Sequence, residues 1–291
     1  NCEALGVPNP ATFEQANAQI SVVTGGNSNL NPETSKSLTL GAVYSPTWGE
    51  NTSWSQKLDF EVTYYNIKIK DAIQASDAQT QLDRCVATLD PVFCGGISRS
   101  SGGNINGFDN TLFNLGKINT KGVDLGINWL GNETGIGTFG ASLSATRVSS
   151  YEAIATDSGL TEPRVVGVEV NDSAIPDWRA TARLSWSIKD VNVSWTARYT
   201  SDLTEDCDQV GTFDNCSNAA AGKNHLGSTT FHDLRASWKL PTELDLTIAG
   251  GINNITDKEP PICQSCSLNG YDASTYDLPG RYSYVEASVK F

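Results

Sequence analysis

The chain of 291 residues contains no methionine, only two histidines, and 20 lysines and arginines against 33 aspartates and glutamates. Its net charge of −13 argues against a nucleic-acid partner, whose phosphates would repel it. No stretch approaches the roughly 20 apolar residues of a membrane helix, so any membrane role must come from strands. Because His225 and His232 show no metal-ligand spacing to the cysteines, we expect neither a metal site nor a cofactor.

Catalytic motifs are also missing from the sequence. It contains no GxSxG elbow, no HExxH helix and no phosphate-binding loop, so we expect no enzyme. The chain opens at Asn1-Cys2-Glu3, without a starting methionine or a signal segment. We interpret it as a mature or cleaved fragment of a longer protein.

The seven cysteines make an odd count. Six of them form three local pairs, each in its own polar loop: Cys85 and Cys94, Cys207 and Cys216, and Cys263 and Cys266. We predict three disulfides, hence an oxidising compartment, and a partner for Cys2 on an upstream segment. The spacing of Cys263 and Cys266 favours a loop staple over a redox or zinc motif, which would need a βαβ context or four ligands.

Strict alternation of apolar and polar residues is the main structural signal, and it is clearest in residues 280–291. There Val285, Ala287 and Val289 face one way and Tyr282 and Tyr284 the other, as in a strand with one apolar face. The same alternation predicts about nine long strands. They span residues 34–48, 54–73, 111–130, 136–150, 177–188, 191–203, 230–240, 243–253 and 280–291.

The connections between these strands are short and long in turn. This pattern predicts an all-β antiparallel meander of about nine transmembrane strands, with short turns on the periplasmic side and long loops outside. Reversing the faces of residues 177–188 would put arginine into lipid, at about 2 to 4 kcal/mol each near the midplane. Six tryptophans fall on the apolar face near the short-turn ends, as in an aromatic girdle. They are Trp48, Trp54, Trp129, Trp186, Trp195 and Trp238.

Four segments of the chain resemble TonB-dependent outer-membrane receptors. They are TGGNSNLNPETS at 24–35, FNLGKINTKGVD at 113–124, GINNITDKEPP at 251–261 and the closing strand at 280–291. The first departs from the family pattern at Ser28 and Asn31, which are small polar changes in a loop. The four segments in this order are far more specific than any one of them.

The resemblance implies a plug domain followed by a barrel of roughly 22 strands, of which this chain is the C-terminal part. Residues 1–33 are then an outer loop segment leading into the barrel, and 34–291 are barrel strands with long extracellular loops. The plug and the earlier strands are absent from the chain. Because an open sheet would leave unpaired edges in lipid, we predict that the missing portion or a second chain completes the barrel.

The function implied by the resemblance is active uptake of a scarce nutrient across the outer membrane of a Gram-negative bacterium. Siderophores, cobalamin, carbohydrates and peptides are all carried by relatives. The implied partners are outer-membrane lipid, lipopolysaccharide, the small-molecule substrate and, through the plug, the TonB complex. Two alternatives stay open: a passive porin, and a secreted β-sandwich adhesin or binding module, whose strands would be shorter.

Five residues are candidates for ligand contact on the lumen face near the outer mouth: Arg179, Arg198, Asp233, Tyr282 and Tyr284. The arginines could hold an anionic ligand, and the tyrosines could stack on sugars or aromatic chelators. The favoured alternative is that such lumen charges pair with one another or with the plug.

A separate acidic cluster of Glu205, Asp206, Asp208 and Asp214 could hold a divalent cation or bridge to lipopolysaccharide through one. It lacks the spaced ligands and turn glycine of a calcium loop. We therefore expect a solvated loop, closed by Cys207 and Cys216.

Overall fold

The structure is a computed structural model that describes residues 1–17, 19–74, 78–114, 116–154, 166–169, 174–206, 216–242, 245–266, 270–277 and 280–290. The chain divides into two compact units. Unit 1 comprises residues 1–36, 67–119 and 152–163, and unit 2 comprises residues 37–66, 120–151 and 164–291. The expected boundary at residue 33, between the outer loop segment and the barrel strands, stays a prediction.

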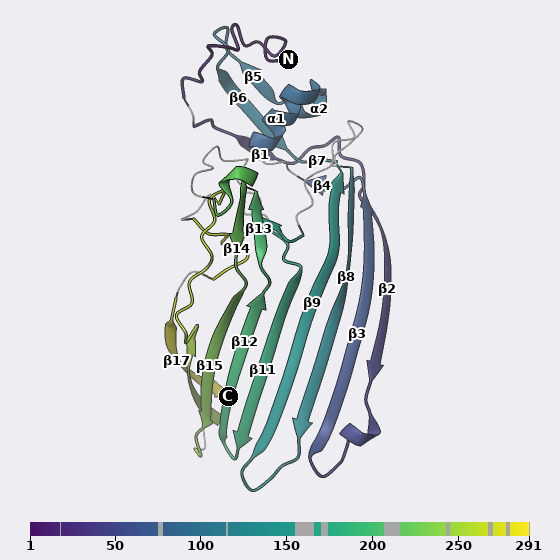
Figure 1. Cartoon of the computed structure of the whole chain (residues 1–291), viewed down its shortest axis with the longest axis vertical. Helices are drawn as coiled ribbons and strands as arrows, with labels where there is room; N and C mark the ends of the chain where they lie inside the picture. The colour runs from purple at the N-terminus through teal and green to yellow at the C-terminus, as the bar shows by residue number, and fades with distance from the viewer. Residues whose placement is uncertain are drawn as a thin grey trace. The chain divides into compact units, whose positions relative to one another are not determined.

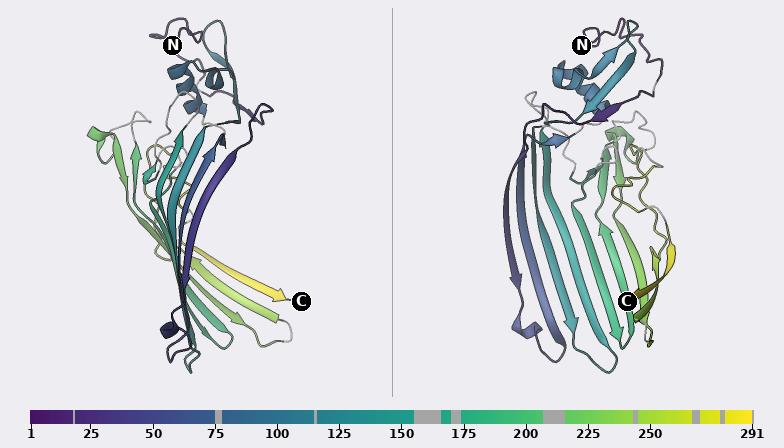
Figure 2. Two further views of the ribbon diagram at one scale, coloured as in Figure 1. Left: turned by 90° about the vertical axis from the view of Figure 1, so that its right-hand side faces the viewer. Right: turned by 180° about the vertical axis from the view of Figure 1, so that it is seen from behind.

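A nine-stranded sheet dominates the fold, with the strand order β17-β16-β15-β12-β11-β9-β8-β3-β2 (Figure 1). Its strands are β2 (Thr34–Tyr44), β3 (Ser55–Lys70), β8 (Lys117–Gly131), β9 (Thr138–Ile154), β11 (Trp178–Ile188), β12 (Val191–Thr200), β15 (Thr229–Lys239), β16 (Asp245–Asn253) and β17 (Tyr282–Lys290). Strands that lie side by side in this sheet also follow one another along the chain, which confirms the predicted antiparallel all-β meander. The sheet is strongly twisted and open, with β2 and β17 at opposite edges (Figure 2).

Each of the nine predicted strands has a counterpart, although several ends differ. Strand β3 stops at Lys70 rather than at Ile73, because Asp71 adopts a left-handed φ of 55° that ends the extended backbone. The predicted strand 191–203 ends at Thr200, and a separate strand begins at Leu203.

The two faces of the sheet differ as the alternation predicts. On β11 and β12 the apolar residues Leu184 and Trp195 lie directly opposite one another, while Arg183 lies opposite Thr196 on the other face. The apolar face is exposed: Leu184 is 53% and Val285 is 84% accessible. An ordinary protein core would have buried these side chains, so this face is suited to contact lipid.

Five of the six predicted girdle tryptophans lie at or near the short connections, and Trp195 lies farther from the turn, as the fifth residue of β12 (Val191–Thr200). Trp48 lies in the 3-10 turn η1 (Thr47–Gly49) between β2 and β3, and Trp186 is two residues from the end of β11. The rings of Trp54 and Trp129 stack with centroids 6.3 Å apart, and the Trp186 indole donates to the Ile136 carbonyl at 2.7 Å. Their positions agree with the predicted aromatic belt at one end of the strands.

Unit 1 contains helices that the sequence does not predict. Alternation predicts a long polar loop over residues 74–110, where the structure has helices α1 (Ala78–Thr88) and α2 (Pro91–Cys94). Asp90 caps α2 by accepting from the Val92 amide at 2.8 Å, and Phe93 is fully buried. None of the described helices is long and apolar enough to cross a membrane.

Three small sheets accompany the large one. Strands β1 (Val23–Gly25), β6 (Ile105–Thr111) and β5 (Ile97–Arg99) form one, and β4 (Ile73–Gln74) pairs with β7 (Phe113–Asn114). In unit 2, β10 (Val168–Glu169), β13 (Leu203–Asp206) and β14 (Lys223–Leu226) form the third. The long connections of unit 2 therefore have their own ordered core.

That loop core corrects one expectation. Leu203, Leu226, Phe231, Cys263 and Tyr276 form a buried apolar cluster. Glu205, expected in a solvated loop, is fully buried beside it, so that expectation is wrong for this residue. Asp208 and Asp214 lie outside the described residues, as does the side chain of Asp206.

Candidate ligand site on the polar face of the sheet

The predicted site residues lie on the polar face of four strands. Arg179 is on β11 opposite Thr200, and Arg198 is on β12 opposite Thr181, so the two arginines share one face. Asp233 on β15 lies opposite Thr196 on that same face. Alternation along each strand fixes these positions, because residues two apart face the same side.

Arg198 is held by two carboxylates. Its Nε and Nη2 donate to the two Asp233 oxygens at 2.9 and 3.4 Å, and its Nη1 donates to Asp277 at 2.5 Å. The guanidinium also lies 5.3 Å from the centre of the Phe231 ring. Arg198 and Asp233 therefore pair with each other, which is the alternative to direct ligand contact that the sequence analysis favours.

Arg179 is placed differently. It is exposed and makes no ion pair with any residue that the structure describes. Together with Arg198 it lines a pocket of about 290 Å³ whose wall is rich in hydroxyl groups. The lining residues are Ser144, Thr146, Arg179, Ala180, Thr181, Arg198, Tyr199, Thr200 and Thr275. This pocket joins a guanidinium that has no ion-pair partner among the described residues to several hydroxyl groups, a combination that suits an anionic, oxygen-rich ligand.

Tyr282 and Tyr284 form a second group on β17. Their rings stack with centroids 6.5 Å apart and planes 18° from parallel. Gly251 lies opposite Tyr284 in the register and leaves room for its ring, since a Cβ there would come within 2.6 Å of it. Within the part of the chain that the structure describes, no hydrogen bond or ring contact joins this tyrosine pair to the arginines, so the five candidates fall into two groups.

Several residues of the arginine site were not predicted, and two of them lie outside the strands of the large sheet. Asp277 and Thr275 come from the connection between β16 and β17, and Asp277 is 79 residues from Arg198 in sequence. No local pattern marks such a partner, because it depends on how a long loop folds back.

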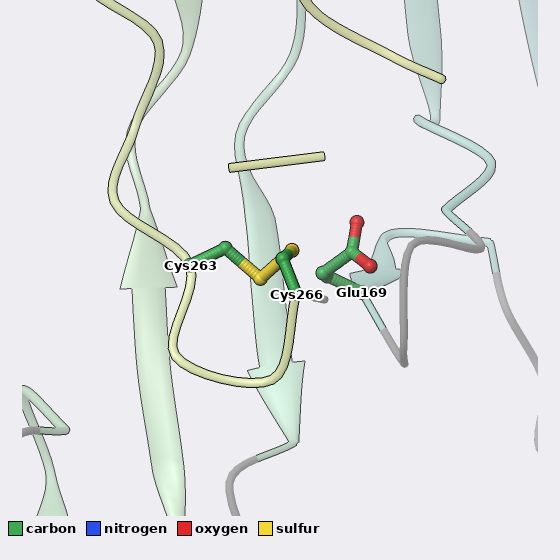
Figure 3. A group of neighbouring side chains, drawn as sticks. All are labelled: Glu169, Cys263 and Cys266. Atoms are coloured by element: carbon green, nitrogen blue, oxygen red, sulfur yellow. A yellow bond between two sulfur atoms is a disulfide. The ribbon is translucent and has the colours of Figure 1, made fainter. Parts of the chain in front are cut away.

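The cysteines largely follow the prediction. Disulfides join Cys85 to Cys94 and Cys263 to Cys266, with Cα atoms 4.8 and 5.5 Å apart, while Cys2 is free. Cys207 lies outside the described residues, so its pairing with Cys216 stays a prediction. The Glu169 carboxylate lies close to the Cys263–Cys266 bridge (Figure 3). Because both sulfurs are used in the bridge, the pair offers no thiolate to a metal.

A twisted antiparallel sheet with an exposed apolar face, a polar face carrying arginines and tryptophans at its short-turn end is part of the wall of a transmembrane β-barrel. The sequence matches the family described as TonB dependent receptor-like, beta-barrel, over residues 6–255. The chain belongs to this family. No curated protein matches it in sequence.

Solved structures show the same fold. The ferric enterobactin receptor PfeA from Pseudomonas aeruginosa matches 92% of this chain with a TM-score of 0.57 at 18% identity. The FrpB iron transporter from Neisseria meningitidis matches 91% with a TM-score of 0.52 at 17% identity. The siderophore receptor PirA from Acinetobacter baumannii matches 91% with a TM-score of 0.53 at 15% identity. In each case the chain spans 32% of the solved protein, about a third of its length.

Proposed function

We propose that this chain is the C-terminal part of the barrel of an outer-membrane receptor that imports a scarce nutrient with energy supplied through TonB. The family match over residues 6–255 carries this proposal. The apolar face of the sheet then contacts the lipid of a Gram-negative outer membrane, and the polar face lines the lumen.

The two free edges of the sheet support the incomplete-barrel part of this proposal. Strands β2 and β17 each have one neighbour in the described sheet, on opposite edges. Exposed edges have no hydrogen-bond partners in lipid, so the membrane form needs further strands between them. The earlier strands of a barrel of roughly 22 strands supply them, from the same protein or from a second chain, and a plug fills the lumen.

For the nutrient, we propose an anionic iron chelate of the siderophore class. Arg179 has no ion-pair partner among the described residues and lies with Arg198 in a pocket of about 290 Å³. Deprotonated chelating oxygens carry negative charge, which a guanidinium binds by charge-assisted hydrogen bonds. Structures similar to this chain include a ferric enterobactin receptor in complex with enterobactin, which supports the same class.

The test compares two arginines of one strand and one face. Arg179→Ala removes the uncommitted charge of the pocket, whereas Arg183→Ala removes a charge outside it. With the complete protein in outer-membrane vesicles, we expect Arg179→Ala to weaken binding of ferric siderophores about tenfold or more and Arg183→Ala to leave it unchanged. Equal effects of the two changes would contradict the pocket as the binding site.

A second measurement separates receptor from porin. Uptake by whole cells should stop when the inner-membrane proton gradient is dissipated, because transport depends on energy passed through TonB. Uptake that continued unchanged would show a passive pore, and the TonB-dependent proposal would be wrong.

A further inference from the structure

Three neighbouring strands of the large sheet, β8, β9 and β11, carry the same pattern on the apolar face (Figure 1). Each has an aromatic residue near a short connection, followed on that face by three apolar residues. The aromatic residues are Trp129, Phe139 and Trp186, and the apolar residues are Val123, Leu125 and Ile127 on β8, Ala141, Leu143 and Ala145 on β9, and Ala180, Ala182 and Leu184 on β11. Eight positions from the aromatic residue, the rows end at Lys121, Arg147 and Trp178, all in unit 2. We call these three residues the basic boundary.

The basic boundary lies where the apolar band of the wall ends. Eight residues of a strand span about 27 Å, or about 20 Å of depth at the tilt of roughly 40° that barrel strands adopt. The apolar band of an outer-membrane barrel is about 25 Å tall and has aromatic residues at both of its limits. The tryptophans at the short-turn end mark one limit, so Trp178 and the two cations mark the other.

Arg147 lies on the apolar side of the sheet and not on the lumen side. It is opposite Trp178 in the register, as Phe139 is opposite Trp186. Its guanidinium carbon is 5.6 Å from the centre of the Trp178 ring, which makes a cation–π contact. Arg147 is also exposed. The indole therefore holds an accessible guanidinium at the edge of the apolar band.

Lys121 approaches Arg147 from the next strand. The Ser149 hydroxyl donates to the Lys121 carbonyl at 3.0 Å. The Thr146 hydroxyl donates to the Asp124 carboxylate at 2.7 Å. Both bonds fit one antiparallel register in which Ser149 faces Lys121. Arg147 is then a diagonal neighbour of Lys121, with Cα atoms about 7 to 8 Å apart, so the two long side chains can reach one anion.

No carboxylate of the described residues neutralises these two cations. Neither Lys121 nor Arg147 forms an ion pair with them. Asp124 is on the opposite, polar face, because it bonds to Thr146, which alternates with Arg147. In a chain with a net charge of −13, two adjacent cations at the end of an apolar surface indicate an anionic partner outside the chain.

We propose that Lys121, Arg147 and Trp178 bind a phosphate group of lipopolysaccharide in the outer leaflet. This rests on the proposed function, which places the apolar face in an outer membrane with the long connections outside. A charged side chain is costly in hydrocarbon but favourable at the depth of anionic head groups. Arginine binds phosphate through paired N–H groups and lysine as a point charge, while tryptophan suits the boundary between apolar and wet layers.

The lipid site and the ligand pocket lie on opposite faces of the same strands. Thr146 on β9 and Arg179 on β11 line the pocket, and each is adjacent in sequence to a residue of the basic boundary. Because neighbours in a strand face opposite sides, either site can be altered while the other keeps its side chains.

The test uses the complete protein in a neutral detergent, titrated with fluorescently labelled lipid A that carries both of its phosphates, and follows anisotropy. We expect saturable binding that weakens as the salt concentration rises. Dephosphorylated lipid A and phosphatidylglycerol should each bind about tenfold more weakly, because the first lacks the phosphates and the second has a single phosphate that is shielded by esterification on both sides.

Substitutions at the basic boundary complete the test. The double change of Lys121→Gln and Arg147→Gln should weaken binding of lipid A about tenfold or more, because it removes two charged contacts and keeps side chains of similar shape. Trp178→Leu keeps an apolar side chain without the cation–π contact and should weaken binding about threefold.

Two exposed cations of the same sheet serve as matched controls. Lys189→Gln removes a charge at the short-turn end, and Arg183→Gln removes one from the polar face of β11. Both should leave lipid A binding unchanged. A loss as large as that of the double variant would overturn the proposal, and so would equal affinity for dephosphorylated lipid A or for phosphatidylglycerol.

Binding of ferric siderophores, measured on the same preparations, separates this proposal from the proposed function. The double variant should retain it, which also shows that the variant is folded. Loss of lipid A selectivity with siderophore binding intact would overturn the lipid site alone. Failure of the unaltered protein to bind siderophores, with lipid A selectivity intact, would contradict the proposed nutrient and support the lipid site.

Discussion

Gly122 of β8 lies directly against the hydroxyl group of Tyr65 on β3. A methyl group built on Gly122 would overlap that hydroxyl and the backbone carbonyl of Arg147 on β9. A side-chain tip can rotate away, but a backbone carbonyl within a sheet cannot. The glycine of the KGVD segment at 121–124 is therefore required by close packing between three adjacent strands.

From this packing we expect Gly122→Ala to lower the free energy of unfolding by about 1 to 3 kcal/mol, the usual cost of overpacking. Urea unfolding of the complete protein in detergent, followed by tryptophan fluorescence, measures it. Gly250→Ala is the matched control, because its Cβ would meet only the Tyr284 carbonyl at an ordinary 3.6 Å. If the two variants unfold at the same urea concentration, the close contact at Gly122 does not exclude a side chain larger than glycine.

The Arg198 and Asp233 pair gives a second prediction. The two side chains are 37% and 20% exposed and share a two-point hydrogen bond, so solvent screens them only in part. A double-mutant cycle with Arg198→Gln and Asp233→Asn should give a coupling energy of about 1 kcal/mol. The more exposed pair of Lys239 and Asp245 should give a smaller one. A larger coupling at the control pair would reverse this ranking.

The disulfides give a third prediction. In the entropic model, the bridge between Cys85 and Cys94 stabilises its region by about 3 kcal/mol and the shorter bridge between Cys263 and Cys266 by about 2. Replacing both cysteines of the first pair with serine should expose residues 78–94 to protease, as should reduction of the unaltered protein. Peptide mapping without reductant should recover both bridges together with the predicted bridge between Cys207 and Cys216. Cleavage that does not depend on reductant would contradict the stabilising role of the first bridge.

The sheet could be predicted from the sequence because its signal is local. Alternation along each strand fixes which side chains share a face. Arginines then identify the polar face, and tryptophans identify the apolar face. The cysteine pairs at 85 and 94 and at 263 and 266 were predictable for the same reason, since their short separations favour pairing within one loop.

The loops could not be predicted in this way. Asp90-Pro91 is a recognisable helix start, but the polar composition of residues 74–110 favours an irregular loop. Glu205 looked solvated because acidic neighbours follow it, whereas its burial depends on Asn224 and Ser265, 19 and 60 residues away. Such contacts arise only when separate connections pack together, and alternation carries no information about them.

The last prediction tests which face of the sheet meets lipid, using adjacent residues of β11. Ala182 lies opposite Ala197 and Leu143 on the apolar face, four residues from Trp186 and hence deeper in the membrane. Thr181 is exposed on the polar face. Ala182→Arg should cost about 2 to 4 kcal/mol, because the charge enters hydrocarbon, while Thr181→Arg should cost less, because its charge meets only Arg198 across the strands in a hydrated lumen. Unfolding of both variants in lipid vesicles measures the difference. Equal costs, or a greater cost at Thr181, would mean that the exposed apolar face does not contact the acyl chains.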